Sequence, residues 1–299
     1  MRFGLTVPNF GDYFDPRVLA ALARDAEHAG WDGFFVWDHT VIWPTPTVDP
    51  WVALSAIAIA TERIRIGPLV TPLPRRRPTK LAREVISLDH LSDGRVILGV
   101  GIGAGPWEWD YLGEETDPRT RGAMLDEGLD LLAKLWSGEP VRHDGRFYSF
   151  RGDGGPDNPE PMPAPFLPAP VQRPRVPIWV AGTWPSKPPF RRAARWDGVV
   201  PVARGAGMVN SLTPDQVRDV VAFIGERRSG NQPFDVVVAG HTDIDGDTEE
   251  VQEQAGAGAT WWLEDISPWA FGWQWEGSWP IDQMNDRVRA GPPRLRHDD

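Results

Sequence analysis

The chain has 299 residues, of which 41% are hydrophobic and 24% charged, a composition typical of a globular protein with a sizeable core. It contains no cysteine, which excludes disulfides, thiolate metal sites and cysteine nucleophiles. The net charge of −11 argues against a nucleic-acid partner, because such proteins need a basic face to displace counterions from phosphates. We find no segment like a signal peptide and no apolar run of about 20 residues, so we expect a cytoplasmic protein with no membrane partner.

Short β-type runs alternate with helix-type runs, which is the pattern of βα units that form a parallel sheet. The first strand is expected at Arg2 to Val7, and the next helix at Pro16 to Ala29, with Asp15 as its N-cap and Gly30 as its C-cap. Three further units fill the chain to about residue 137. Their strands are expected at 33–38, 64–70 and 95–101, and their helices at 50–60, from 78 onward and at 120–136.

The alternation then breaks and later resumes. Residues 140–150 predict a hairpin that turns at Asp144-Gly145, and the Pro- and Gly-rich residues 152–177 predict a long insertion or lid. Further strands are expected at 177–182, 198–202, 234–240 and 259–265, with helices at about 189–196, 214–228 and 249–255. Eight parallel strands in a chain of this size favour a (β/α)8 TIM barrel over an open sheet. We therefore expect one domain over residues 1–299, with an insertion at about 139–176 and a Trp-rich extension at about 265–299.

Active sites of such barrels lie where each strand runs into its following loop. The second strand ends at Asp38 and His39. A histidine titrates near neutral pH and can transfer a proton, while Asp38 could fix its orientation. A structural pair that caps the strand is the alternative. No ligand spacing for a metal appears among the histidines, so we expect no metal site.

Two glycine segments can meet a flat ring or a phosphate. The run from Gly99 to Gly105 matches the dinucleotide-binding pattern G-x-G-x-x-G poorly, but it presents backbone without obstructing side chains. The segment Ala181 to Trp184 precedes a helix and offers backbone amides and a hydroxyl for a phosphate, or it is an ordinary turn. The run Arg75 to Arg77 is either a solvated loop or a contact to an anionic cofactor tail.

Several segments together resemble the luciferase-like monooxygenase superfamily, which includes enzymes that use FMN and enzymes that use the deazaflavin F420. The resemblance rests on residues 37–39, 66–84, 88–103, the hairpin and 177–200, and covers nearly the whole chain. It implies a flavin-type ring at the C-terminal mouth of the barrel, a non-proline cis peptide at Leu69-Val70 or Val70-Thr71, and His39 beside the reactive part of the ring. It also implies a homodimer, a small-molecule substrate and, for some members, a separate reductase that supplies reduced cofactor.

The expected site follows from the strand ends and this resemblance. The catalytic residues are His39 and Asp38. The residues expected to contact the cofactor are Asn9, Leu69, Val70, Thr71, Gly101, Ile102, Gly103, Ala181, Gly182, Thr183 and Trp184, and those expected to face the substrate are Trp43, Trp262 and Glu264.

One departure limits what the resemblance implies. The deazaflavin-dependent sugar-phosphate dehydrogenases carry a Glu just after the Gly-x-Gly of the fourth strand, and this chain has Ala104 there. Their proton-donor chemistry and substrate are therefore not expected here. Six tryptophans in the last forty residues predict either an aromatic wall for an apolar or planar substrate or a packed seam.

The choice between FMN and F420 stays open, with F420 slightly favoured by the Asp38-His39 pair and the arginine run. Two alternatives to a flavin-type oxidoreductase remain. One is a cofactor-free barrel that binds a ligand without catalysis, and the other is a barrel lyase or hydrolase with Glu264 or Asp265 as its carboxylate.

Overall fold

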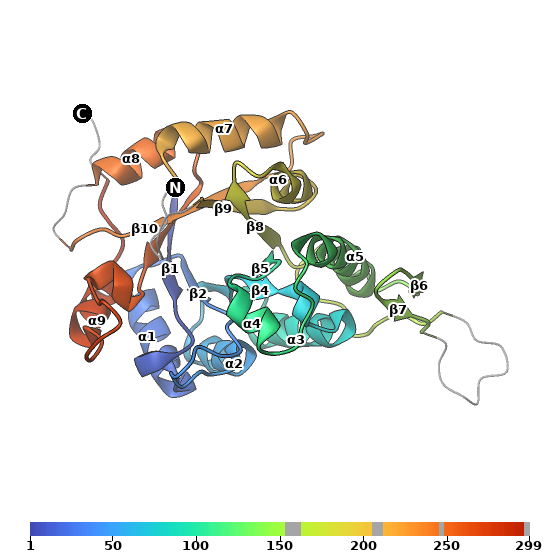
Figure 1. Ribbon diagram of the computed structural model, residues 1–299, viewed down its shortest axis with the longest axis horizontal. Coiled ribbons are helices and arrows are strands. Elements are labelled where there is room, and N and C mark those ends of the chain that lie inside the picture. Colours follow the sequence, from blue (N-terminus) through green and yellow to red (C-terminus); the bar gives the residue numbers. More distant parts are fainter. Residues whose placement is uncertain (153–162, 205–211, 245–247, 296–299) are drawn as a thin grey trace. The chain divides into compact units, whose positions relative to one another are not determined.

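The computed structural model describes residues 1–152, 163–204, 212–244 and 248–295 (Figure 1). The chain forms two compact units. The first comprises Met1–Val70, Ile97–Val100 and Pro177–Asp299, and the second comprises Thr71–Val96 and Gly101–Val176. The single domain expected from the sequence stays a prediction.

The first unit is built on a ring of parallel strands. In the part of the chain that the structure describes, these are β1 (Arg2–Val7), β2 (Gly33–Val36), β3 (Arg65–Pro68), β5 (Leu98–Gly101), β8 (Ile178–Trp184), β9 (Gly198–Ala203), β10 (Asp235–Gly240) and β11 (Trp261–Asp265). They are ordered β3-β2-β1-β11-β10-β9-β8-β5. The N–H of Ile97, just before β5, donates to the carbonyl of Ile66 in β3 at 2.9 Å, so the two ends of the ring meet. The predicted (β/α)8 barrel is confirmed.

A glycine makes this closure possible. A Cβ at Gly67 would lie 1.8 Å from the carbonyl oxygen of Ile97, a separation that no side chain can adopt. The backbone of β3 therefore reaches the strand that closes the barrel because residue 67 has no side chain.

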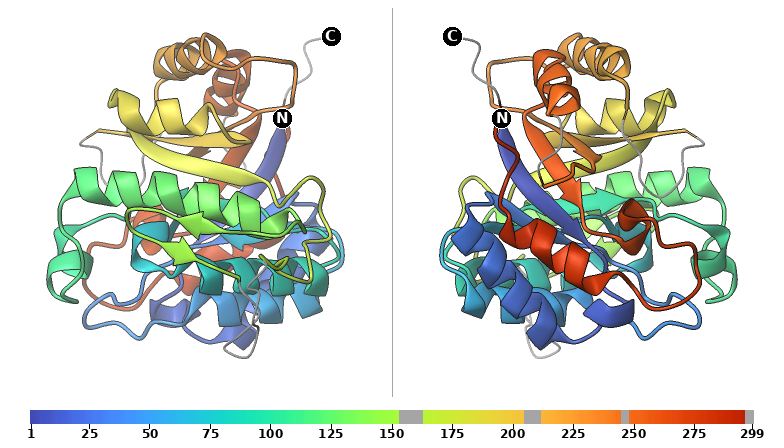
Figure 2. Two further views of the ribbon diagram at one scale, coloured as in Figure 1. Left: turned by 90° about the vertical axis from the view of Figure 1, so that its right-hand side faces the viewer. Right: turned by 90° about the vertical axis from the view of Figure 1, so that its left-hand side faces the viewer.

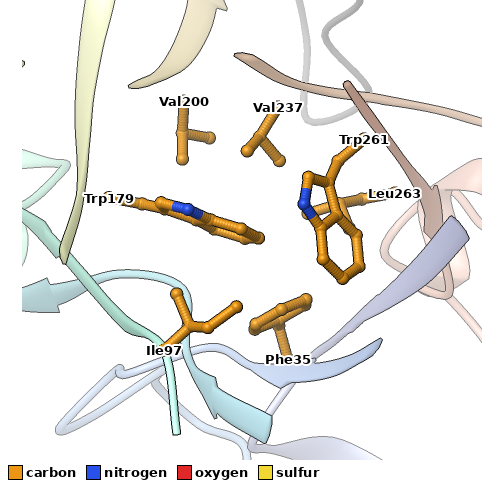
Figure 3. Close-up of a cluster of buried hydrophobic side chains, with 7 residues drawn as sticks. All are labelled: Phe35, Ile97, Trp179, Val200, Val237, Trp261 and Leu263. Atoms are coloured by element: carbon orange, nitrogen blue, oxygen red, sulfur yellow. The ribbon is translucent and has the colours of Figure 1, made fainter. Parts of the chain in front are cut away.

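The interior of the barrel is filled by large apolar side chains. Figure 3 shows the core cluster, in which Trp179 and Trp261 are fully buried with their ring centroids 5.3 Å apart. Phe35 packs against both rings. Leu69, Ala181 and Ala239 are packed against this cluster. Such a barrel has a filled centre, so a ligand site can form only at its mouth.

Helices pack around the ring of strands. They are α1 (Pro16–Ala29), α2 (Pro50–Ala60), α6 (Lys187–Ala193), α7 (Pro214–Gly225), α8 (Glu249–Gly256) and α9 (Ile281–Arg289), with the short 3-10 helices η1 (Gly11–Tyr13) and η3 (Pro268–Phe271). The caps predicted for α1 are confirmed, since Asp15 accepts a hydrogen bond from the N–H of Arg17 at 2.8 Å and Gly30 has a φ of 94°. Helix α6 begins at Lys187 and not at Pro189.

The expected C-terminal extension contains a helix that the sequence reading missed. Helix α9 packs beside α1, as the red and blue helices of Figure 2 show. Its buried side chains are Met284, Arg287 and Val288. A buried arginine on this face hides the apolar spacing that normally reveals a helix.

The second unit contains β4 (Thr71–Pro72), η2 (Leu73–Arg75), α3 (Pro78–Leu91), α4 (Pro106–Asp110), α5 (Pro118–Trp136), β6 (His143–Asp144) and β7 (Ser149–Phe150). The predicted hairpin is confirmed, with Gly145 donating its N–H to the carbonyl of Tyr148 at 3.0 Å. The short helix α4 was not predicted. Residues 153–162 of the expected insertion lie outside the described residues. No helix within the described ranges is long and apolar enough to cross a membrane.

Candidate functional site at the C-terminal mouth

The side chain of Asn9 positions the backbone at His39 through hydrogen bonds. Its side-chain amide donates to the carbonyls of His39 and Val48, at 2.9 and 2.7 Å, and its oxygen accepts the N–H of His39 at 3.2 Å. Asn9 is fully buried. Asn9 thus positions the loops that follow β1 and β2, which occupy its polar atoms, and its contact with a cofactor stays a prediction.

His39 lies among aromatic rings. We call the group Phe10, Trp37, His39, Trp269 and Trp279 the aromatic rim. The His39 ring lies 5.8 Å from Phe10 and 5.9 Å from Trp37, in both cases edge to face. Trp37 and Trp269 are parallel to within 1°, with centroids 6.3 Å apart.

A buried donor of the rim lacks a hydrogen-bonding partner in the described part of the chain. The indole N–H of Trp269 is buried and has no hydrogen-bonding partner among the described residues. A buried donor of this kind calls for a ligand or a water. Trp273 and Trp275 pack against the Trp269 ring, edge-on and tilted, with centroids 5.6 and 4.9 Å away. These tryptophans form an aromatic cluster, and its role as a wall for a substrate stays a prediction.

Asp38 and Trp43 are the other predicted site residues that follow β2. Asp38 is buried at the end of β2, with 5% of its surface exposed, whereas Trp43 is 87% exposed. Their roles toward His39 and toward a substrate stay predictions.

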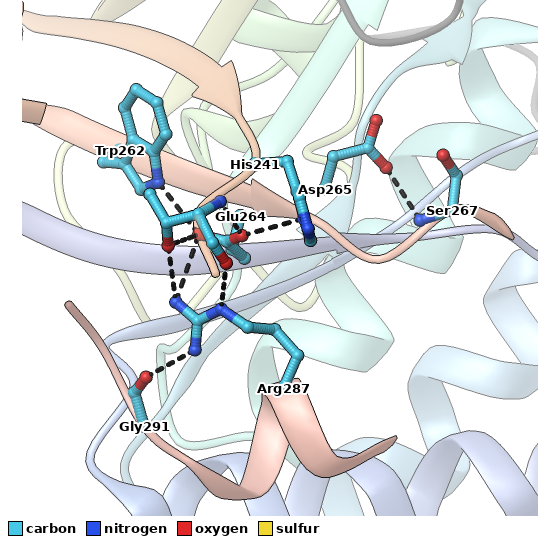
Figure 4. A network of polar contacts seen from close by, with 8 residues as sticks. His241, Trp262, Glu264, Asp265, Ser267, Arg287 and Gly291 are labelled. Atoms are coloured by element: carbon cyan, nitrogen blue, oxygen red, sulfur yellow. Dashed lines mark hydrogen bonds and ion pairs between the residues drawn. The ribbon is translucent and has the colours of Figure 1, made fainter. Parts of the chain in front are cut away.

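Trp262 and Glu264 are interior residues of strand β11. Both are fully buried, and Figure 4 shows them in a polar network on β11. The Glu264 carboxylate accepts the N–H and the hydroxyl of Thr242 at 2.6 and 2.9 Å, and the indole N–H of Trp262 at 3.1 Å. Nη2 of Arg287 donates to it at 3.2 Å. The structure gives no support to direct substrate contacts of these two side chains, because both are buried and the protein supplies the donors to the Glu264 carboxylate, so the contacts stay predictions. The same burial argues against a lyase or hydrolase that would use Glu264.

Arg287 anchors helix α9 to this carboxylate. Its other nitrogens donate to the carbonyls of Thr242 and Gly291, each at 2.8 Å. Burial would raise the pKa of Glu264, but hydrogen bonds from His241 and the charge of Arg287 hold that pKa below its ordinary value.

Two other groups of the network, His241 and Asp265, have pKa values raised above their ordinary values. Burial alone would lower the pKa of His241, but Glu264, whose Oε1 lies 3.1 Å from its Nδ1, raises that pKa above its ordinary value. Burial raises the pKa of Asp265 to about 6, although the N–H of Ser267 donates to it at 2.8 Å. The sequence alone assigns His241 no role, since its partner Glu264 comes 23 residues later on another strand.

The segment Ala181 to Trp184 is strand and not a turn. Strand β8 continues to Trp184, and helix α6 begins at Lys187, so the expected amides at a helix N-terminus are not here. Trp184 is buried between Lys187 and Phe190, at 3.5 and 4.9 Å from its ring. Thr183 is exposed, and its predicted contact with the cofactor, like those of Ala181 and Gly182, stays a prediction.

The bulge after β3 has the expected backbone. The peptide bond between Leu69 and Val70 is cis, at the first of the two positions that the resemblance implied.

The second unit contains the other expected cofactor residues. Thr71 is fully buried in β4. The carbonyl of Ile102 accepts Nη1 of Arg121 at 3.1 Å. Gly103 has a φ of 81°, and a Cβ there would lie 2.1 Å from the ring of Trp109. Gly101 to Gly103 therefore pack within their own unit, and their contact with a cofactor stays a prediction.

Arg75 does not form part of a solvated loop. Its side chain is 6% exposed and pairs with the buried Glu108 at 3.4 Å. The guanidinium groups of Arg75 and Arg121 lie 4.6 and 4.2 Å from the Trp109 ring. Arg75 is thus an internal cation, and its predicted contact with an anionic tail has no support. In the described residues, no group of three or more His, Asp or Glu could hold a metal ion.

Comparisons with known proteins agree with this architecture. Residues 1–287 match the sequence profile of the luciferase-like monooxygenase family. An uncharacterised protein of Mycobacterium tuberculosis is 37% identical over 186 residues, covering 55% of this chain and 61% of the relative. The F420-dependent glucose-6-phosphate dehydrogenase of Beutenbergia cavernae is 36% identical over 181 residues, covering 58% of this chain and 49% of the relative. The matches thus span about half to three fifths of these relatives.

Solved structures share the fold at low sequence identity. The monooxygenase RslO1 of Streptomyces bottropensis superposes with a TM-score of 0.72 at 20% identity, covering 97% of both chains. An F420-dependent secondary alcohol dehydrogenase, in complex with an F420-acetone adduct, gives a TM-score of 0.70 at 18% identity, covering 97% of this chain and 98% of that one.

Proposed function

Because the chain belongs to the luciferase-like monooxygenase family, we propose that it is an oxidoreductase that binds the deazaflavin F420, with FMN as the competing cofactor. The observation that carries the proposal is the position of His39, held by Asn9 among the planar side chains of the aromatic rim at the C-terminal mouth. Curated relatives at 34 to 36% identity are named F420-dependent glucose-6-phosphate dehydrogenases, which supports F420 over FMN.

The residues of the rim fit a flat heteroaromatic ring. Trp37 and Trp269 offer apolar faces, and the buried indole N–H of Trp269 is a donor for a ring carbonyl. His39 has a polar ring at the same rim and can hold or move a proton next to the bound molecule. When bound, a deazaflavin accepts or delivers a hydride, a pair of electrons with a proton.

The substrate of this site is proposed to be a small apolar or planar organic molecule. The rim is aromatic, and Trp273 and the 60%-exposed Trp275 extend it outward. Ala104 stands where the sugar-phosphate dehydrogenases carry a Glu, so their substrate is not transferred to this chain. A homodimer, a cytoplasmic location and a reductase partner belong to the same proposal.

Calorimetric titration of the purified protein with F420 and, separately, with FMN tests the cofactor. We expect F420 to bind more tightly. His39→Asn should weaken that binding by about tenfold, equivalent to the loss of roughly one hydrogen bond of about 1.4 kcal/mol. The matched control is His28→Asn on the exposed face of α1, which should bind like the wild type. Absence of binding by both cofactors to a folded protein would refute the proposal and favour the cofactor-free barrel.

A further inference from the structure

We propose that His241 is a second catalytic imidazole of this mouth, a protonated donor that supplies a proton to the substrate, with Glu264 and Arg287 as its positioning residues. The inference rests on the proposed function and deepens it. It states that the site reduces its substrate, and it names a proton donor in a chain that lacks the Glu of the sugar-phosphate dehydrogenases.

The position of His241 follows from the topology. It comes directly after β10, and the parallel strands of the barrel end on the same side as the loops that carry Asn9 and His39. Its ring packs edge to face on Phe271, with centroids 4.6 Å apart. Phe271 ends the short helix η3, which also contains Trp269 of the aromatic rim. His241 therefore packs on the segment that contributes Trp269 to the aromatic rim. His39 contacts Phe10 and Trp37, whose rings in turn lie against Trp269.

One nitrogen of the His241 ring faces a buried carboxylate, and the other does not. Its Nδ1 lies 3.1 Å from Glu264, whose carboxylate is fully buried, while the imidazole side chain remains 19% exposed (Figure 4). Since Nδ1 faces the carboxylate, Nε2 is the nitrogen that can meet a ligand. This arrangement of an imidazole oriented by a buried carboxylate is the one that proton-transferring histidines use.

The charges around His241 favour its protonated form. Glu264 and the more exposed Asp243 raise its pKa, and burial and Arg287 lower it, with a net rise above the ordinary value. Among the described residues, Asp265 is a further titratable neighbour, and burial raises the pKa of its own carboxyl. Arg287 fixes Glu264 as an anion, so the carboxylate is not available to take the proton itself.

The proton balances a hydride addition. A hydride that adds to an unsaturated carbon of the substrate leaves an anion, and that anion takes a proton from Nε2 of His241. A reduced deazaflavin or flavin, when bound, would supply the hydride and would lose two electrons in doing so. The imidazole ring becomes neutral and regains its proton from solvent.

The test is nitrogen NMR of the histidine side chains in the whole protein, with His241→Gln identifying the resonance. In the wild type, His241 is expected to titrate above its ordinary pKa. In Glu264→Gln the pKa should fall below the ordinary value, because burial and Arg287 then dominate. Asp243→Asn, a carboxylate at the same ring but exposed, should lower the pKa less. If Glu264→Gln does not fold, the double variant E264Q/R287M, which leaves no unpaired buried charge, replaces it.

The second arm adds saturating F420 or FMN, whichever the calorimetry shows to bind. The His241 resonance should shift on binding, whereas the exposed His28 should not. A bound cofactor that leaves His241 unshifted, or a His241 that titrates below its ordinary pKa in the wild type, would overturn the inference while the proposed function stands. Failure of both cofactors to bind would instead refute the proposed function.

Discussion

Asp265 gives the sharpest test of the electrostatics of the mouth. It ends β11, is 4% exposed, and has its pKa raised by burial from 3.8 to about 6. A shift of about two pKa units corresponds to roughly 3 kcal/mol of preference for the neutral carboxyl in the folded state. The folded pKa lies above the unfolded one, so this contribution to stability is fully present below about pH 4 and is lost as the pH rises through 6.

Replacing Asp265 with Asn removes this titration and keeps an acceptor for the N–H of Ser267. Relative to the wild type, the free energy of unfolding of Asp265→Asn should therefore increase by about 3 kcal/mol between pH 4 and pH 7. Urea unfolding followed by circular dichroism at the two pH values measures this difference. His241 and Glu264 titrate in both proteins, so most of their contribution cancels in the comparison.

The matched control is Asp144→Asn, at an exposed position of the hairpin, which should change the pH dependence by less than about 0.5 kcal/mol. The reasoning would be refuted if Asp265→Asn and the wild type lost stability equally between the two pH values. That result would mean that the carboxyl at the end of β11 is ionised in the folded protein with no penalty.

Two further predictions concern the frame of the site. Arg287→Met leaves the buried Glu264 without its cation and should cost about 3–5 kcal/mol in urea unfolding, whereas E264Q/R287M should recover most of it. The control is Arg289→Ala. Arg289 pairs with Asp25, their side chains are 57% and 33% exposed, and its loss should cost under about 1 kcal/mol. An equal loss of stability in Arg287→Met and Arg289→Ala would contradict the argument that burial makes the Arg287 pair costly to break. Gly67→Ala should prevent closure of the barrel and lower the free energy of unfolding by more than about 3 kcal/mol. Gly256→Ala is the control, because the space around its Cβ is open, and it should be neutral or stabilising. Thermal unfolding followed by calorimetry measures both.

The strands of the barrel could be predicted because each carries its own local signal. Apolar runs bounded by Gly, Pro and Asp mark all eight, and caps such as Asp15 and Gly30 mark helix ends. Helix α9 could not be found in this way, since one of the three residues that it buries is Arg287. Its burial makes sense only once Glu264, from a distant strand, is placed opposite it.

The site was predictable in position but less so in the role of each residue. The rule that strand ends form the active mouth indicated Asn9, His39 and Glu264, but not whether a polar side chain faces a ligand or a neighbouring loop. Asn9 and Glu264 turned out to be satisfied by protein groups, because their partners come from loops and strands far away in sequence. Which partner a buried polar group finds is a property of tertiary packing that strand-end position does not encode.

The fluorescence of the parallel indole rings of Trp37 and Trp269 offers a way to detect a bound cofactor. Indoles emit at wavelengths that flavin-type rings absorb, and energy transfer between them falls steeply with separation. A cofactor seated at the aromatic rim would therefore quench the emission of these two side chains more than that of the tryptophans buried deeper in the barrel. If the aromatic rim binds the cofactor as proposed, the fluorescence of these two side chains would report the binding.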